Sequence, residues 1–400
     1  MTPTVLVGFA EAMSAPEVVW SLARRGYKVA AFARAGKRSA LRHSRYTTYD
    51  EIVPPDLDVG EALSGLTQLC RKHLQNGPVV LFPLDDSAVW LASRVASLPG
   101  LMLAGPPPDR AEVALDKEKQ LVLARKAGFR VPATSFCASV EQLRRVAGSF
   151  PLIIKPASAA RELGGRLIKG RSWICDNAKE LESAIAQGAG HWPALVQPFV
   201  SGTGEGVFGI AHDGGVSAWS GHRRLRMMNP HGSGSSACVS QPVPEDLRST
   251  ALRFVREVQW VGLFMIEMLR DNAGDLWFIE FNGRPWGSMA LSCRQGFEYP
   301  AWNVDLALEP RSIPIPNEQT NGSIVCRNLG REFMHLLFVL RGPKSTALRD
   351  WPSFWKAFSA VVTFRRTDAI YNWYSRDPSV VITDCYFTIR DNLFKTRRPR

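Results

Sequence analysis

Residues 262–284 read GLFMIEMLRDNAGDLWFIEFNGR, and this stretch decides the fold. Two apolar runs flank the turn-forming letters DNAGD, which is the pattern of a β-hairpin. If Ala273 and Gly274 form a two-residue loop, Glu267 lies directly opposite Glu280. Because directly opposed like charges destabilise a sheet, the two carboxylates need a cation between them. The hairpin therefore predicts a cation site.

Asn282 belongs to the same predicted site. It follows two residues after Glu280, so its side chain falls on the same face of the strand. Two carboxylates and an amide oxygen are hard ligands that suit Mg²⁺ or Mn²⁺, with phosphate oxygens and water completing the coordination. We therefore predict that Glu267, Glu280 and Asn282 bind a divalent metal ion. The alternative is a solvent-facing pair of carboxylates in a slipped register.

The first 108 residues alternate between short apolar strands and amphipathic helices. Strands are predicted at 4–8, 28–33 and 79–82, and helices at 15–25 and 87–95. This alternation indicates a parallel sheet with ligands at the carboxyl ends of its strands. Asp85 and Asp86 stand at such an end, where we expect one of them to cap the next helix.

Two lysines precede the hairpin in positions that suit a phosphate clamp. Lys117 opens a predicted helix that Asp116 caps, and Lys155 ends a predicted strand. The loop of small residues after Lys155 contains Gly164 and Gly165, whose backbone N–H groups can close over phosphate oxygens. Either lysine alone is more often a surface residue, but together with the acidic hairpin they predict a nucleotide site.

The order of these motifs resembles that of the ATP-grasp superfamily. They read DK at 116–117, IIKP at 153–156, GG at 164–165, LVQPFVSG at 195–202, IE at 266–267 and IEFNGR at 279–284. Over residues 1–305 the chain is most similar to the branch of carboxylate–amine ligases related to the large chain of carbamoyl-phosphate synthetase. The resemblance implies an α/β protein of the ATP-grasp type. Its expected parts are a Rossmann-like parallel-sheet unit at 1–108, a lid subdomain at 109–196, a catalytic subdomain with the metal hairpin at 197–310, and a basic aromatic extension at 311–400.

The resemblance also implies a role for each matching residue. Lys117 and Lys155 would contact phosphates, and Gly164 and Gly165 would close over them; Gln197, Pro198, Phe199 and Val200 would form the adenine hinge, Glu205 would hold the ribose, and Arg284 would stabilise the transferring phosphoryl group. The sequence departs from the family pattern twice. The hinge reads Gln-Pro where an acidic residue is common, and an extra residue precedes Glu205.

The segment HRRLR at 222–226 resembles a substrate loop of the same branch. Arg224 and Arg226 alternate along a predicted strand, so both guanidinium groups share a face and can hold a carboxylate or phosphate by paired hydrogen bonds. The Gly/Ser-rich residues 232–236 that follow are suited to closing on substrate. The alternative is a solvated basic strand.

Composition indicates the class and compartment of the protein. Of the 400 residues, 45% are hydrophobic and 22% charged, as in ordinary globular proteins, and no apolar run is long enough to span a bilayer. The N-terminal residues do not form a signal peptide. The seven cysteines are scattered without zinc-ligand spacing, so we expect reduced thiols in a cytoplasmic protein.

Residues 311–400 carry much of the net charge of +12, because they contain 15 Lys/Arg against 7 Asp/Glu. This basic extension suits an acidic partner such as a membrane surface or a polyanion, although no nucleic-acid-binding motif accompanies it. A solvated surface with a basic tail is the alternative. Aromatic and basic residues occur together in this extension, namely Trp351, Trp355 and Phe358 with Lys356, Arg365 and Arg366. They predict either an amphipathic segment lying on the inner face of an anionic membrane or aromatic side chains packed on the core.

These features predict an ATP- and Mg²⁺-dependent ligase that activates a carboxylate as an acyl phosphate and couples it to an amine, releasing ADP and phosphate. The predicted catalytic residues are Arg284, Lys155, Arg224 and Arg226. The alternatives are an ATP-grasp enzyme that uses bicarbonate or another nucleophile, and a nucleotide-binding regulatory protein without turnover. We expect a small-molecule acid and amine as substrates, no specific nucleic acid, and a homodimer.

Overall fold

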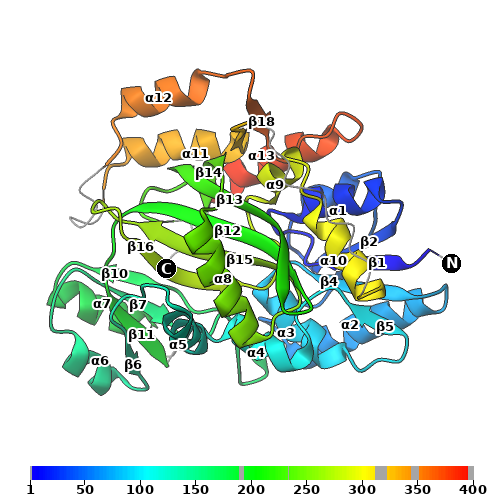
Figure 1. Cartoon of the computed structure of the whole chain (residues 1–400), viewed down its shortest axis with the longest axis horizontal. Helices are drawn as coiled ribbons and strands as arrows, with labels where there is room; N and C mark the ends of the chain where they lie inside the picture. The colour runs from blue at the N-terminus through cyan, green and yellow to red at the C-terminus, as the bar shows by residue number, and fades with distance from the viewer. Residues whose placement is uncertain (1, 189–192, 233, 311–321, 344–350, 395–400) are drawn as a thin grey trace.

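The computed structural model describes residues 2–188, 193–232, 234–310, 322–343 and 351–394. It is an α/β protein that combines one parallel sheet with antiparallel sheets, as the sequence predicts. Figure 1 places the parallel sheet on the right, a small antiparallel sheet at the lower left and a large antiparallel sheet between them. All seven cysteines are free thiols. Among the described helices, none combines the length and apolarity that a membrane crossing requires.

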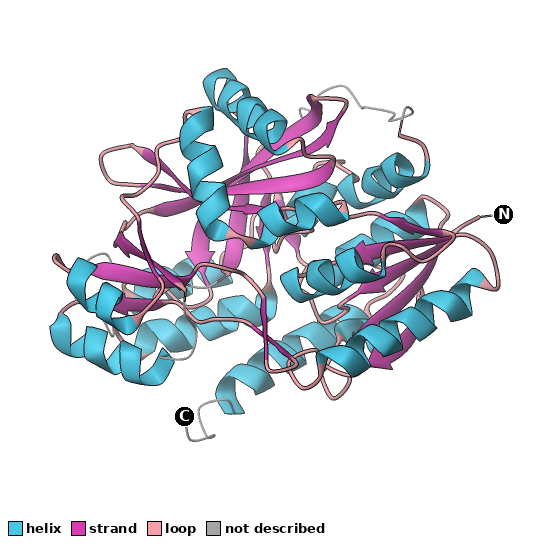
Figure 2. Cartoon of the chain, turned by 90° about the horizontal axis from the view of Figure 1, so that it is seen from below, coloured by secondary structure: helices cyan, strands magenta, loops and turns pink. Residues whose placement is uncertain are grey.

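The N-terminal unit is a five-stranded parallel sheet in the order β3-β2-β1-β4-β5. Its strands are β1 (Thr4–Gly8), β2 (Lys28–Arg34), β3 (Thr48–Ile52), β4 (Val79–Pro83) and β5 (Leu101–Leu103). Its helices are α1 (Ala15–Arg24), α2 (Val59–Leu74), α3 (Asp86–Val95) and the 3₁₀ helix η1 (Ala40–His43). Figure 2 shows helices on both faces of this sheet. Alternate residues of β1 therefore enter two different cores, with Val5 and Val7 in one and Leu6 in the other.

The region predicted as the lid contains an antiparallel sheet in the order β10-β7-β11-β6, which we call the lid sheet, and a separate two-stranded hairpin; its role as a lid remains a prediction. The elements of this region are α4 (Pro108–Leu115), α5 (Lys117–Ala127), β6 (Ser135–Cys137), α6 (Val140–Val146), β7 (Leu152–Pro156), β8 (Arg161–Leu163), β9 (Arg166–Ile168), β10 (Trp173–Cys175), α7 (Ala178–Gly188) and β11 (Ala194–Pro198). The small-residue segment that the sequence predicts as a loop is instead the β8–β9 hairpin. Gly164 and Gly165 form its turn, where both need a positive φ (57° and 73°).

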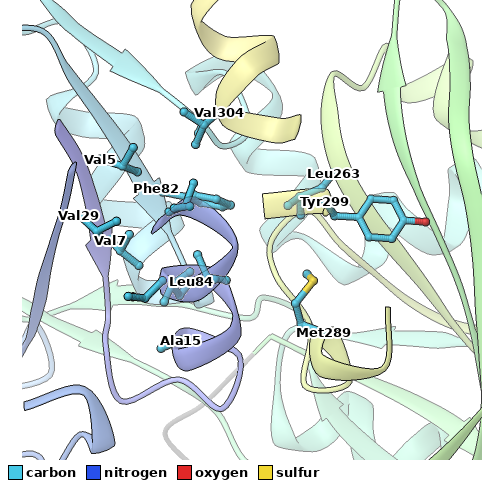
Figure 3. Close-up of a cluster of buried hydrophobic side chains, with 14 of the residues drawn as sticks. Val5, Val7, Ala15, Val29, Phe82, Leu84, Leu263, Met289, Tyr299 and Val304 are labelled. Carbon is cyan, nitrogen blue, oxygen red and sulfur yellow. The ribbon is translucent and has the colours of Figure 1, made fainter. Parts of the chain in front are cut away.

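The large sheet has the order β16-β15-β12-β13-β14-β17-β18. Its elements are β12 (Thr203–His212), β13 (Gly215–Met227), β14 (Ser235–Gln241), β15 (Gly262–Arg270), β16 (Leu276–Asn282), β17 (Val325–Arg327) and β18 (Asp368–Ile370), with helices α8 (Glu245–Val258), α9 (Met289–Arg294) and α10 (Tyr299–Leu308). A cluster of buried side chains joins this sheet to the parallel sheet (Figure 3). In it, Val5 and Phe82 of the parallel sheet share a core with Leu263 of β15 and Val304 of α10.

The C-terminal extension is part of this large sheet. Strand β17 pairs with β14 and β18 pairs with β17. Three helices complete the extension, namely α11 (Leu329–Leu340), α12 (Phe354–Val362) and α13 (Ser379–Phe394). From the sequence we predict helical segments at 332–340 and 353–364, and α11 and α12 confirm them, whereas the two short strands were not expected. The proposed boundary at residue 310 remains a prediction.

The segment SGTGEG at 201–206 predicts a turn from its composition, but this prediction is wrong, because strand β12 already begins at Thr203. Three glycines suggest the turn, but two of them, Gly204 and Gly206, lie within the strand. A Cβ at Gly204 would come within 2.6 Å of the Arg224 side chain, and one at Gly206 within 2.9 Å of the His222 ring. The glycines are required because side chains of β13 pack directly over β12.

Candidate active site

The acidic hairpin brings Glu267 of β15 opposite Glu280 of β16, as predicted. The predicted two-residue loop is wrong, however. The backbone N–H of Asp271 donates to the carbonyl of Asp275, which makes the loop one residue longer, and an extra residue in β16 between the Glu280 and Phe278 pairs restores the register. The amide of Asn282 donates to a Glu280 oxygen at 3.2 Å, so all three predicted metal ligands lie together.

Cations surround this acidic pair. Lys117 Nζ lies 3.1 Å from Glu280 Oε2, and Arg224 Nη2 lies 2.6 Å from Glu267 Oε1. The charge of Lys117 lowers the pKa of Glu280 to about 2, and Glu280 in turn raises the pKa of Lys117. Burial, and then repulsion from Lys117, lower the pKa of Lys155 to about 8. The site therefore holds two carboxylates against at least three cations, a balance that favours a polyanion.

Arg284 brings the N-terminal unit into the site. Its Nε donates to Asp86 Oδ1 at 2.6 Å, and Asp86 is the first residue of α3. Burial disfavours the charged guanidinium, but the Asp86 carboxylate more than offsets this, so the pKa of Arg284 is raised. Glu280 contributes to the same shift, which places Arg284 between the metal hairpin and the end of β4.

Asp85 caps α3, as we expect for one of the two aspartates. Its Oδ1 accepts from the N–H of Ala88 at 2.8 Å. The other oxygen accepts from Arg34 at 2.6 Å and from Lys169 at 3.0 Å. Neither Arg34 nor Lys169 was expected here from the sequence. Arg34 had a usable signal, because it is a charged residue that ends the buried strand β2.

Gln120 is a further site residue that was not expected from the sequence. It lies one turn after Lys117 on α5 and is buried. Its side chain accepts from the N–H of Phe281 at 2.9 Å and donates to the carbonyl of Phe281 at 3.1 Å. Asp116 caps the same helix through the N–H of Lys119. These contacts fix α5 against β16, and so hold Lys117 beside Glu280.

The predicted hinge lies where the lid sheet leads into the large sheet. Strand β11 ends at Pro198, and the N–H of Phe199 donates to the carbonyl of Pro151 at 3.0 Å. The buried Gln197 side chain donates to Thr134 Oγ1 at 2.8 Å. Val200 follows in the connection to β12. This arrangement suits a hinge, and the adenine contact remains a prediction.

Two other predicted nucleotide contacts are engaged elsewhere in this structure. Both oxygens of the buried Glu205 accept from Arg270, at 2.8 and 2.9 Å. The Gly164–Gly165 turn rests on the N-terminal unit, where the carbonyl of Gly165 accepts from the N–H of Val59 at 2.8 Å. The ribose role of Glu205 and the phosphate role of the glycines therefore remain predictions.

Arg224 and Arg226 share the partly buried face of β13 but bind different acids. A register shift lies between them, so β13 is irregular at Leu225. Arg224 pairs with Glu267 in the metal hairpin, whereas Arg226 donates to Glu332 of α11 at 2.7 Å. The structure therefore places Arg224 in the site and commits the Arg226 fork to the C-terminal extension.

Three buried side-chain nitrogen atoms on β13 and on the segment after β16 have no hydrogen-bond partner among the described residues. They are Nε2 of His222, Nε1 of Trp286 and Nε of Arg224. Phe208 links the two rings, because it stacks on Trp286 at 4.3 Å and meets His222 edge-on at 5.0 Å. Burial lowers the pKa of His222 well below its ordinary value, so the ring is neutral. These unpaired groups suit a polar substrate.

The chemistry of the donors determines whether the site fits a metal. Within the described ranges, no group of three His, Cys, Asp or Glu side chains is close enough to hold an ion alone. Glu267, Glu280 and Asn282 supply only two carboxylates and one amide. They therefore fit a Mg²⁺ ion that shares its remaining positions with phosphate oxygens and water.

Comparison with known proteins shows what the chain is similar to. No model of a known protein family matches it. It is 26% identical over 279 residues to the carbamoyl phosphate synthase large chain of Thermotoga neapolitana, a match that covers 66% of this chain and 24% of the relative. The Thermotoga maritima protein of the same name is 26% identical over 283 residues. The chain thus spans about a quarter of the length of these relatives.

Solved structures give a longer match at lower identity. The biotin carboxylase domain of Hydrogenobacter thermophilus 2-oxoglutarate carboxylase, in complex with MgADP and bicarbonate, gives a TM-score of 0.62 at 18% identity, covering 81% of this chain and 74% of that one. The L-amino acid ligase from Bacillus licheniformis gives a TM-score of 0.58 at 18% identity, covering 80% of this chain and 76% of that one. N5-carboxyaminoimidazole ribonucleotide synthetase from Thermus thermophilus gives 0.59 at 15%, covering 80% and 82%. At these identities the likeness shows a shared fold.

Proposed function

We propose, from the premise that this chain is a member of the ATP-grasp superfamily, that it is an ATP- and Mg²⁺-dependent carboxylate–amine ligase. The observation that carries the proposal is the opposed pair Glu267 and Glu280, with Asn282 beside them and cations from three separate parts of the chain around them. A regulatory protein that binds MgATP would use the same metal ligands, so release of ADP is the measurement that separates the two functions.

The nucleotide would lie between the lid sheet and the large sheet. Lys117 and Lys155 would neutralise phosphate oxygens, and Glu267, Glu280 and Asn282 would hold the Mg²⁺ that arrives with ATP. The metal would supply charge neutralisation for the phosphoryl group. In the free protein Lys117 pairs with Glu280. When MgATP binds, a phosphate group would replace Glu280 as the partner of Lys117, and Mg²⁺ would replace Lys117 as the partner of Glu280.

The acid would bind between Arg224 and Arg284. Arg224 offers a planar fork and already contacts a carboxylate, that of Glu267. Trp286 and the neutral His222 add unpaired nitrogen atoms at the same wall. Asp86, which follows β4 of the parallel sheet, contacts Arg284, so the amine would approach from the N-terminal unit, where Asp85 and Asp86 lie at the carboxyl end of that strand.

The chemistry follows from these positions. A free carboxylate is a poor electrophile, so its oxygen would first attack the γ-phosphorus while the bond to the ADP oxygen breaks. The amine nitrogen would then attack the carbonyl carbon of the acyl phosphate, lose a proton and expel phosphate. Arg284 and Lys155 would balance the charge on the transferring group, and positioning would provide most of the acceleration.

Hydroxylamine capture tests this mechanism. With an accepted acid and MgATP, hydroxylamine should intercept the acyl phosphate and give a hydroxamate together with ADP and phosphate. Release of AMP and pyrophosphate would contradict the proposal. Labelled bicarbonate in place of the acid distinguishes the bicarbonate-using alternative, and binding of ATP without ADP release identifies the regulatory one. A cytoplasmic homodimer and a membrane contact remain predictions.

A further inference from the structure

Helix α12 presents its large apolar side chains to solvent. Trp355, Phe358 and Val362 follow the 3-4 spacing of a helix, so they share one face, and their side chains are 75%, 41% and 55% exposed. Phe364, beyond the helix, is also 53% exposed, but its ring contacts the guanidinium of Arg327, so it does not belong to this face. Figure 1 shows α12 at the upper edge of the molecule, outside α11. We call Trp355, Phe358 and Val362 the α12 apolar face.

The opposite side of α12 anchors the helix. Ala357 is buried there, and the guanidinium of Arg327 donates to the carbonyls of Val361 and Thr363 at the end of the helix. Trp351, just before the helix, donates from Nε1 to the carbonyl of Val339 at 3.1 Å. Trp351 therefore packs on the core, as one of the two sequence interpretations expects. Trp355 and Phe358 do not pack on the core. Because the opposite side of α12 is anchored, the apolar face is exposed on a helix that is packed in place.

The charge around the α12 apolar face has one sign. Residues 351–367 contain three cations, Lys356, Arg365 and Arg366, and no Asp or Glu. All three cations are exposed, and within the part of the chain that the structure describes none of them forms an ion pair. By contrast, the exposed Arg144 of the lid faces the carboxylate of Glu182. Bulky apolar groups beside unpaired cations are typical of segments that lie at an anionic lipid surface.

We propose that the α12 apolar face binds the surface of a bilayer containing anionic lipid. Tryptophan and phenylalanine would enter the region between headgroups and acyl chains, where aromatic side chains of membrane proteins concentrate. Lys356, Arg365 and Arg366 would contact lipid phosphates. A second copy of this chain fits the face less well, because a twofold contact would bring two sets of three cations to one interface with no acidic side chain from this segment between them. The inference does not depend on the ligase reaction.

Vesicle flotation of the full-length protein tests the inference. We expect binding to phosphatidylcholine vesicles that contain phosphatidylglycerol, and at least about tenfold weaker binding to vesicles of phosphatidylcholine alone or at high salt. The double variant Trp355→Glu/Phe358→Glu should lose binding to the anionic vesicles. The double variant Arg365→Glu/Arg366→Glu should lose the preference for anionic lipid. ADP release with soluble substrates should be unchanged in both.

Matched controls separate this surface from general stickiness. Leu57→Glu removes an equally exposed apolar side chain in the N-terminal unit, and Lys37→Glu/Arg71→Glu reverses two exposed cations there. Both controls should float as well as the unmodified chain. Equal losses in controls and α12 variants, or no flotation of the unmodified chain, would overturn the inference. Self-association that Trp355→Glu/Phe358→Glu abolishes, without lipid binding, would also overturn it and assign the face to a second copy.

Discussion

Arg224 and Arg226 lie two residues apart along β13, and each belongs to a cluster with acidic side chains. The two clusters differ in burial and in how many partners their carboxylates already have. At Arg226, the carboxylate of Glu332 is 2% exposed and accepts from Arg226, Arg327 and Ser236. At Arg224, Glu267 and Glu280 are 18% and 26% exposed, and each has one cationic partner. A sealed and fully bonded cluster stabilises the fold, whereas a half-open cluster with surplus positive charge can exchange its partners for a ligand.

A substitution in the sealed cluster around Glu332 should give the largest effect, and the quantity affected should be the stability of the fold. Burial alone would raise the pKa of Glu332, but Arg226, Ser236 and Arg327 together lower it, so the carboxylate is charged. Glu332→Gln would leave Arg226 without a carboxylate partner and Arg327 with Asp368 alone, and breaking such a pair in the interior costs about 3–5 kcal/mol. We expect a large fall in thermal midpoint, with ADP release per folded molecule close to normal at low temperature. Unchanged stability would show that the cluster is not structural.

The half-open cluster should give the reverse result. Glu280→Gln removes a predicted metal ligand, and turnover should fall by at least about 100-fold, since losing even an indirect partner of a metal site costs about 10- to 100-fold. The free protein would lose the Lys117 pair but also the repulsion between Glu280 and Glu267, so in denaturant unfolding it should lose less stability than Glu332→Gln does. A variant with normal turnover and a midpoint lowered like that of Glu332→Gln would make Glu280 structural.

The two arginines on β13 sharpen the comparison further. Arg224→Lys keeps the charge but loses the fork, so KM for the acid should rise about tenfold, which corresponds to one charge-assisted hydrogen bond. KM for ATP should change little. Arg226→Lys is the matched control and should mainly lower stability, because Arg226 serves Glu332. If both variants raised KM for the acid equally, both arginines would read the substrate, as the sequence alone predicts.

The sequence predicted the site better than it predicted the connections around it. Glu267 and Glu280 could be paired because strand periodicity is local, although a longer loop and an irregularity in β16 compensated for each other. The contacts of Gln120 and Arg226 could not be foreseen, because they join residues that lie 161 and 106 positions apart in the sequence. The glycines of β12 led to a wrong turn prediction for a similar reason. Glycine is required at these positions because side chains of the neighbouring strand pack over them, which the local sequence does not reveal.

The smallest predicted effect concerns the pH dependence of nucleotide binding. Lys155 has a pKa of about 8 because burial and the charge of Lys117 disfavour its protonated form. Above pH 8 the free protein would therefore have to take up a proton to bind phosphate, and Kd for MgATP should weaken by up to about tenfold per pH unit. Lys155→Arg should abolish this slope. Lys117→Arg is the control and should leave it, because Glu280 raises the pKa of Lys117 and keeps it charged.

Unfolding cannot mimic this result. The pKa of Lys155 lies below its ordinary value of 10.5, so the folded protein gains stability as pH rises from 8 towards 10.5, while nucleotide binding weakens over the same range. Isothermal titration at several pH values, with thermal midpoints measured in parallel, follows both quantities. A Kd that stays constant from pH 7 to 9 would remove Lys155 from the phosphate site.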